Sequence, residues 1–289
     1  MVTLLVALCW LDAQADRPGI YLAPLVVVLC VLATGEMLRM IRAGGGDPLA
    51  WVVYVATLLP VLASCAPIAW REYPENCPVS RLGWLACGLA AGIVVALVGE
   101  MCRYGSEENV AGTTIRNLAL AALSILYVGG LLGFLIQLRL FPGTGEVSPG
   151  LAPLLSLIFV VKVSDTGQYF VGRKFGKRKL APVLSPGKTW EGAVGGIGIS
   201  ALFTSAILAL VFKRMEVQAD WFTVFGYCVV ISLAGLVGDL AESLLKRDAG
   251  VKDSSSWLPG LGGVLDMLDS LLVAAPVAYA CWVLNVIGP

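Results

Sequence analysis

Several absences narrow what this 289-residue chain can be. It contains no histidine, and its eight cysteines stand singly without a C-x-x-C pair, which argues against a zinc or haem site. We interpret the cysteines as small packing residues. Charged residues are only 14% of the chain, against roughly 25% in soluble domains. The 20 basic and 20 acidic residues cancel, so no overall field attracts an anionic macromolecule and we expect no nucleic-acid partner.

Apolar residues, in contrast, are abundant. They make up 58% of the chain, and the mean hydropathy of +0.84 is typical of an integral membrane protein. A helix needs about 20 mostly apolar residues to cross the hydrocarbon. Eight windows meet this length: 19–38, 50–70, 82–102, 117–138, 150–171, 191–212, 221–245 and 264–287. The sequence therefore predicts an all-α, polytopic transmembrane helical bundle with about eight spans.

The segment before the first window resembles a signal peptide only in part. Residues 2–16 have a short apolar core and an Ala-x-Ala tail but no basic residue at the start. A short helix that lies on the membrane or re-enters it is favoured over a cleaved leader. No long soluble insertion follows, so we expect one integral membrane domain. The spans of residues 1–149 carry few polar features, and residues 150–289 carry the polar motifs.

The distribution of Lys and Arg predicts an orientation. Thirteen of the 20 basic residues fall on one side of the predicted membrane, six fall on the other, and Lys162 lies within a span. Loops 172–190 and 246–263 both belong to the richer side. Because cytoplasmic loops carry an excess of Lys and Arg, we expect this side to be cytoplasmic.

The first polar motif is "VKVSDTGQYFVGRKFGKRK", residues 161–179. In this motif, the acidic residue Asp165 and the aromatic residue Tyr169 are four positions apart and share a helix face. Ionisable groups at membrane depth are costly and usually face a cavity. The alternative is an anchoring role, with Lys162 reaching the interface and Asp165 ending the helix. The basic run that starts at Arg173 is also typical of topology signals and of contacts with anionic lipids.

The second motif is "LSPGKTWEG", residues 184–192. Its Gly-Lys-Thr is not a P-loop, because Pro182 stands where that motif needs a glycine. A Ser-Pro turn and a flexible Gly187 at the start of a span are expected instead. Such a turn can present a cation and backbone N–H groups to a phosphate. A plain helix N-terminus is the alternative. The polar residues concerned are Ser185, Lys188, Thr189 and Glu191.

The densest motif covers residues 238–270. Four side chains at positions i, i+3, i+4 and i+7 form one polar helix stripe, which we expect to face water. They are Asp239, Glu242, Ser243 and Lys246. After the helix, Lys252 and Asp253 lead into a glycine-rich loop, and Asp266 and Asp269 open the last span. Carboxylate oxygens are ligands that Mg²⁺ prefers. The alternative is helix capping and surface ion pairs at the interface.

Taken in order, these motifs resemble the phosphatidate cytidylyltransferase (CDP-diacylglycerol synthase) family. The resemblance covers about residues 150–275 closely and the earlier spans by hydropathy alone. It implies an enzyme of phospholipid biosynthesis that makes CDP-diacylglycerol and pyrophosphate from CTP and phosphatidate, with Mg²⁺ as cofactor. The matching stretches are Asp165-x-x-x-Tyr169-x-x-Gly172-Arg173, Ser185-Pro186-x-Lys188-Thr189-x-Glu191-Gly192, Gly238-Asp239-x-x-Glu242-Ser243-x-x-Lys246-Arg247, Lys252-Asp253, Pro259-Gly260, Gly262-Gly263 and Asp266-x-x-Asp269.

The resemblance also implies roles for individual residues. Asp239 and Asp266 would hold Mg²⁺, with support from Asp269 and Asp253. The cations that would balance the nucleotide and lipid phosphates are Lys188, Lys246, Arg247 and Lys252. The hydroxyl groups of Ser185 and Thr189 would donate hydrogen bonds to the phosphates. The other substrate-binding positions implied are Asp165, Tyr169, Arg173, Glu191 and Ser243.

The partners implied are CTP, phosphatidate and membrane lipids, and a homodimer is compatible with this interpretation. The location implied is a bacterial inner (cytoplasmic) membrane, with the active site facing the cytoplasm. This chain departs from the family pattern at Leu261, where a histidine is usual, and at Met267, where an arginine is usual. These departures leave a non-catalytic, lipid-binding relative as one alternative. An ion-coupled transporter is another, but the charges gather at helix ends and not through the bilayer depth.

Overall fold

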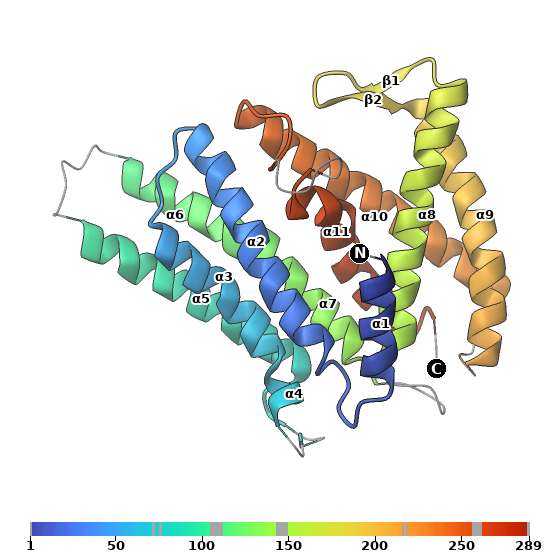
Figure 1. Cartoon of the computed structure of the whole chain (residues 1–289), viewed down its shortest axis with the longest axis horizontal. Coiled ribbons are helices and arrows are strands. Elements are labelled where there is room, and N and C mark those ends of the chain that lie inside the picture. The colour runs from blue at the N-terminus through green and yellow to red at the C-terminus, as the bar shows by residue number, and fades with distance from the viewer. Residues whose placement is uncertain are drawn as a thin grey trace. The chain divides into compact units, whose positions relative to one another are not determined.

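The computed structural model describes residues 2–70, 73–74, 77–104, 112–142, 150–215, 217, 219–255 and 262–287. The described chain is mainly helical (Figure 1). Its elements are α1 (Val2–Ala13), α2 (Leu22–Ala43), α3 (Ala50–Ser64), α4 (Ala66–Ala69), α5 (Arg81–Arg103), α6 (Thr113–Ser124), the π-helix η1 (Ile125–Gly130), α7 (Leu131–Arg139), α8 (Leu151–Phe175), β1 (Lys179–Ala181), β2 (Ser185–Thr189), α9 (Trp190–Arg214), α10 (Trp221–Asp248) and α11 (Val264–Val283).

Backbone contacts divide the chain into two compact units. The first unit comprises Met1–Gln137 and Asp248–Met267, and the second comprises Leu138–Arg247 and Leu268–Pro289. Each unit therefore combines segments that are far apart in the sequence. The sequence-based division into residues 1–149 and 150–289 follows the motifs, whereas these units follow the packing.

Seven helices in the described part of the chain are long and apolar enough to cross a membrane, with α6, η1 and α7 forming one of them. This confirms the polytopic helical bundle. The window 50–70 gives a shorter helix than expected, because α3 ends at Ser64 after 15 residues. Pro67 follows, and a proline inside a helix lacks the N–H donor and clashes with the carbonyl four residues earlier. The chain restarts instead as the short α4.

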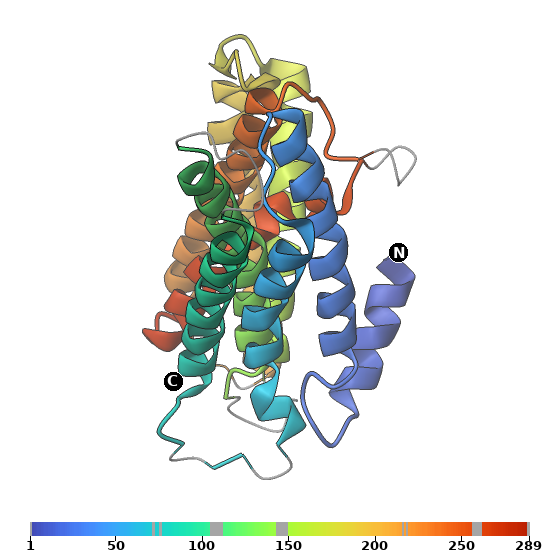
Figure 2. The ribbon, with the colours of Figure 1, turned by 90° about the vertical axis from the view of Figure 1, so that its left-hand side faces the viewer.

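In the first unit, α2, α3 and α5 lie side by side with the α6–η1 stretch (Figures 1 and 2). Their fully buried core includes Val53, Ala56 and Ile125. The hydroxyl groups of Thr34 and Thr57 lie 2.9 Å apart and join α2 to α3. Small residues and interhelical hydroxyl contacts of this kind are the usual means of close helix packing in a membrane.

In the second unit, α8 and α9 pack along their lengths and carry a β-ribbon at one end (Figure 1). Strands β1 and β2 pair antiparallel, with Lys179 opposite Thr189. The expected Ser-Pro turn was wrong, because Ser185 and Pro186 lie within β2. A two-stranded ribbon has only edge strands, so a proline that cannot donate a ladder hydrogen bond is tolerated there.

The helix expected before the first span is present as α1. The carboxylate of Asp12 is buried near its end and accepts hydrogen bonds from the backbone N–H of Gly19 at 3.0 Å and of Tyr21 at 2.9 Å. These bonds fix the turn that leads into α2. The position of α1 relative to a membrane stays a prediction.

Candidate functional site

The predicted site residues fall into two polar clusters, one in each unit. The Asp239 cluster belongs to the second unit and comprises Asp165, Lys188, Asp239, Ser243, Asp269 and Ser270. The Glu36 cluster belongs to the first unit and comprises Glu36, Ser254, Gly263, Val264, Leu265 and Asp266.

The Asp239 cluster gathers side chains from α8, β2, α10 and α11. The ammonium group of Lys188 on β2 lies 2.7 Å from Oδ2 of Asp239 on α10. The hydroxyl of Ser243, one turn further along α10, donates to Oδ1 of Asp239 at 3.5 Å. On α11, Oδ1 of the buried Asp269 accepts hydrogen bonds from the backbone N–H and the hydroxyl of Ser270. The motifs that were separate in the sequence therefore meet here.

The cluster carries more negative than positive charge. Asp269 lies close enough to Asp165 and Asp239 for the three carboxylates to repel one another. Lys188 faces Asp239, and Lys162 lies 3.8 Å from Asp165. Three carboxylates beside two ammonium groups favour an added cation, because charges attract strongly where water is partly excluded. The described residues contain no group of three or more Asp, Glu, Cys or His side chains that could hold a metal ion.

A glycine allows α10 and α11 to meet beside these carboxylates. A Cβ atom at Gly238 would overlap the backbone carbonyl oxygen of Asp269 and would lie 3.0 Å from Cα of Ser270. No larger residue fits at this position without moving a helix. Gly238 therefore brings its neighbour Asp239 near Asp269.

Contrary to our expectation, the polar stripe on α10 does not face water along its whole length. Glu242 is fully buried, so the prediction that the stripe faces water was wrong at this residue. The ammonium of Lys246, one turn away, lies 2.7 Å from Oε2 of Glu242 and compensates its charge. Beyond it, Nε of Arg247 donates to the carbonyl oxygen of Leu184 at 3.2 Å. The phosphate-binding roles of Lys246 and Arg247 stay predictions.

The residues around the ribbon have structural partners. The hydroxyl of Thr189 caps α9 by accepting the N–H of Gly192 at 3.1 Å. The carboxylate of Glu191 accepts the N–H groups of Lys177 and Arg178 at 3.0 and 3.1 Å. These bonds join the start of α9 to the segment that leads into β1.

The remaining predicted residues lie on α8, on β2 and after α10. Arg173 donates to the hydroxyl oxygen of the exposed Tyr169 at 3.1 Å. Ser185 is half-buried on β2, whereas Lys252 and Asp253 are exposed after α10. Pro259, Gly260 and Leu261 lie outside the described residues. Substrate roles for these positions stay predictions.

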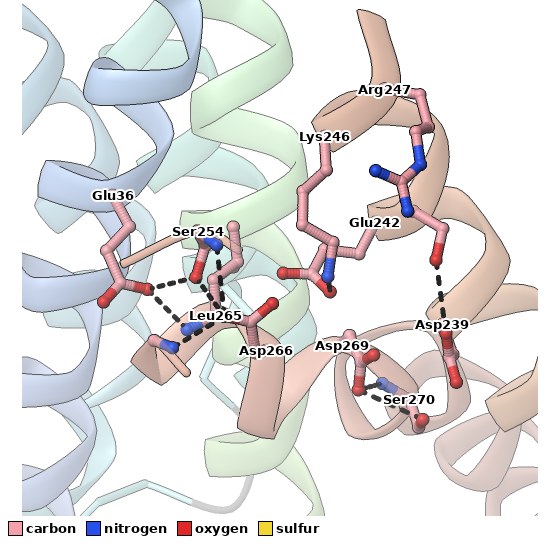
Figure 3. Close-up of polar contacts among 12 residues, drawn as sticks. Glu36, Asp239, Glu242, Lys246, Arg247, Ser254, Leu265, Asp266, Asp269 and Ser270 are labelled. Atoms are coloured by element: carbon pink, nitrogen blue, oxygen red, sulfur yellow. Dashed lines mark hydrogen bonds and ion pairs between the residues drawn. The ribbon is translucent and has the colours of Figure 1, made fainter. Parts of the chain in front are cut away.

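The Glu36 cluster contains a residue that the sequence interpretation missed. Glu36 lies on α2 and is 2% exposed. It accepts hydrogen bonds from Ser254 and Leu265 (Figure 3) and also from the N–H of Val264. Ser254 also contacts the predicted metal ligand Asp266 at 2.6 Å. The first spans are therefore not without polar features. The available signal was a single acidic residue inside the otherwise apolar window 19–38.

Comparisons with known proteins identify the family to which the chain is similar. A model of the Cytidylyltransferase family matches residues 1–284. Phosphatidate cytidylyltransferase of Mycobacterium leprae is 31% identical over 282 residues, which cover 90% of this chain and 82% of the relative. Phosphatidate cytidylyltransferase of Haemophilus influenzae is 44% identical over 159 residues, which cover 53% of this chain and 51% of the relative. The enzyme of the same name from Pseudomonas aeruginosa is 45% identical over 127 residues, covering 44% of this chain and 46% of the relative. In these last two comparisons the match spans about half of the relative's length.

Proposed function

Because the chain belongs to the cytidylyltransferase family, we propose that it transfers the cytidylyl group of CTP to phosphatidate, giving CDP-diacylglycerol and pyrophosphate. The observation that carries this proposal is the Asp239 cluster, where the Lys188 cation and three carboxylates from three apolar helices meet. The names of the relatives support the choice of substrates. No observation favours the transporter or the non-catalytic relative.

The proposed reaction is a substitution at phosphorus. A phosphate oxygen of phosphatidate attacks the α-phosphorus of CTP, and the bond from this phosphorus to the bridging oxygen of the β-phosphate breaks. Pyrophosphate leaves with the electron pair of that bond. The attacking phosphate is already anionic at neutral pH, so the chain needs no strong general base, in agreement with its lack of histidine. Catalysis then depends on positioning and on neutralising phosphate charge.

The residues of the second unit can supply this neutralisation. In the proposal, Lys188 exchanges its contact with Asp239 for a contact with a phosphate oxygen, since a charge-assisted hydrogen bond to phosphate is strong. Arg247 adds positive charge at the end of α10, while Lys246 is paired with the buried Glu242. Ser185 and Ser243 donate hydrogen bonds, and Thr189 keeps the start of α9 in place through its cap.

The donor chemistry of the acidic residues suits Mg²⁺, which prefers carboxylate oxygens and water. Bound Mg²⁺ would neutralise phosphate charge and polarise the α-phosphorus. Within the second unit, Asp239 is the proposed ligand, with Asp269 in support. Asp266 of the first unit stays a predicted ligand, and Asp253 a predicted support.

Removal of divalent ions with EDTA should abolish turnover, and added Mg²⁺ should restore it. Asp266→Asn should lower the affinity for Mg²⁺ that turnover requires, without unfolding the protein.

The protein is an integral membrane protein. We propose a bacterial inner membrane as its location, with the active site facing the cytoplasm, where CTP is found, while the diacyl substrate stays in the leaflet. The excess of Lys and Arg on one side supports this orientation. Single cysteines introduced into loops 172–190 and 246–263, in a background without the native cysteines, test it. Labelling of either loop from outside intact cells contradicts the orientation.

The activity is tested with purified full-length protein, phosphatidate and Mg²⁺, and with CTP labelled at either the α- or the γ-phosphate. The α-label should appear in a lipid-linked product, and the γ-label in pyrophosphate, in equal amounts. Transfer of the γ-label to lipid would indicate a kinase. The absence of both products from a folded protein at saturating substrates would reject the proposal and favour the non-catalytic relative.

A further inference from the structure

The structure contains a buried carboxylate at the start of α11. Oε1 of Glu36 accepts the backbone N–H of Val264 at 3.0 Å. Its Oε2 accepts the backbone N–H of Leu265 at 2.7 Å (Figure 3). The first N–H groups of a helix have no partner within the helix, and this end is also the positive end of the helix dipole. Glu36 on α2 therefore satisfies two donors of a helix more than 200 residues further along the chain.

A serine connects this carboxylate to that of Asp266. The hydroxyl oxygen of Ser254 lies 3.1 Å from Oε2 of Glu36 and 2.6 Å from Oδ2 of Asp266. The same Oδ2 accepts the N–H of Ser254 at 3.2 Å and the N–H of Gly263 at 2.6 Å. Two backbone N–H groups on one oxygen fix the orientation of the Asp266 side chain. The single hydroxyl proton of Ser254 is shared between Asp266 and Glu36.

The space between these groups is filled. A Cβ atom at Gly263 would overlap the hydroxyl oxygen of Ser254 and Oε2 of Glu36. The guanidinium of Arg39 lies 3.8 Å from Oε1 of Glu36 and is more than half exposed, so it compensates the buried charge only in part. Most of the stabilisation of the Glu36 carboxylate therefore comes from the N–H groups of Val264 and Leu265, with a contribution from the Ser254 hydroxyl that it shares with Asp266.

We propose that Glu36 is a positioning residue for the transfer reaction: it holds Ser254 and the first turn of α11, and thereby sets the orientation of the Asp266 carboxylate. The inference rests on the proposed function, in which Asp266 takes part. Glutamine cannot replace Glu36, because its amide has one acceptor oxygen. Its NH₂ group would point either at the N–H of Val264 or at the N–H of Leu265 and would leave that donor without an acceptor.

The test compares Glu36→Gln with a matched control, Asp12→Asn. Asp12 is also a buried carboxylate of the first unit that accepts two backbone N–H groups, but its donors are Gly19 and Tyr21. Each purified variant is assayed for kcat and for the KM of CTP. Hydrogen exchange of backbone amides is measured in parallel on the full chain, because it reports the hydrogen bonds whether or not the protein turns over.

For Glu36→Gln we expect kcat to fall about 10- to 100-fold, the range for groups that orient a metal-binding side chain through hydrogen bonds. The KM for CTP should change less than about threefold. Exchange at Val264 and Leu265 should become faster. For Asp12→Asn, kcat should stay near the wild-type value, and faster exchange should be confined to the Gly19–Tyr21 turn. A wild-type kcat for Glu36→Gln, or unchanged exchange at Val264 and Leu265, overturns the inference.

Two further results separate the possible failures. If Glu36→Gln does not fold, Ser254→Ala replaces it. This change keeps the contacts of Glu36 with α11 but removes the shared hydroxyl, and kcat should fall with KM unchanged; an unaltered kcat contradicts the inference. If the wild-type protein forms no product, the proposed function fails. The exchange rates at Val264 and Leu265 then decide whether Glu36 holds α11.

Discussion

The two polar clusters contain similar acidic groups but differ in their partners. In the Glu36 cluster, the carboxylates of Glu36 and Asp266 accept hydrogen bonds from backbone N–H groups and one hydroxyl. In the Asp239 cluster, the carboxylates lie near one another and near the flexible side chain of Lys188. The first set of bonds is fixed by the backbone, whereas the second depends on side chains that can rotate.

This difference separates a supporting region from a reactive one. Backbone N–H groups at a helix start have few alternative partners, so breaking these bonds leaves buried donors unsatisfied at a cost of about 1–3 kcal/mol each. A partly exposed lysine–carboxylate pair contributes only about 0–1 kcal/mol, so a phosphate can displace it easily. We infer that the backbone bonds of the Glu36 cluster hold Asp266 in position, whereas the Asp239 cluster exchanges its internal partners for ligands.

The largest expected effect is the loss of Asp239. Asp239→Asn should lower kcat about 100- to 1,000-fold, the range for the loss of one group that stabilises transition-state charge. The fold should persist, because the ion pair with Lys188 contributes little to stability. Steady-state kinetics and thermal unfolding of the purified variant measure both effects. A variant that keeps its activity but loses stability would show that Asp239 supports the fold and not the reaction.

A smaller effect is expected for Lys188. Lys188→Met should reduce kcat/KM for CTP about 10- to 100-fold, because a charged hydrogen bond contributes about 1.5–3 kcal/mol and each 1.4 kcal/mol is a factor of ten. Lys213→Met is the control, since Lys213 is an exposed cation at the far end of α9. Equal losses in both variants would show that general charge, and not the position of Lys188, is what matters.

The smallest effect is expected at Thr189, which belongs to the supporting contacts around the ribbon. Thr189→Ala removes the cap of α9 and should lower the free energy of unfolding by about 1 kcal/mol, with kcat within about threefold of wild type. Thr189→Ser, which keeps the capping hydroxyl, should retain the stability. A much larger loss of kcat than of stability would instead support the predicted hydrogen bond from Thr189 to a phosphate.

The helices followed from the sequence because long apolar runs are a strong local signal, as in α9 and α10. The end of α3 was missed because Pro67 lies inside an apolar run, so hydropathy hides the break. Motif spacing indicated Asp239 and Lys188, but their 2.7 Å contact joins β2 to α10 and depends on tertiary packing. Glu36 was missed for the same reason, since its partners lie more than 200 residues away.

A double-variant comparison of Asp239 and Lys188 tests the central claim most directly. Activity and unfolding free energy are measured for Asp239→Asn, for Lys188→Met and for both together. If the two side chains serve ligands, the double variant should be at least as inactive as Asp239→Asn, with a coupling energy in stability of no more than about 1 kcal/mol. If the pair instead serves the fold, the double variant should regain stability and activity relative to the single variants, and that recovery would contradict the account.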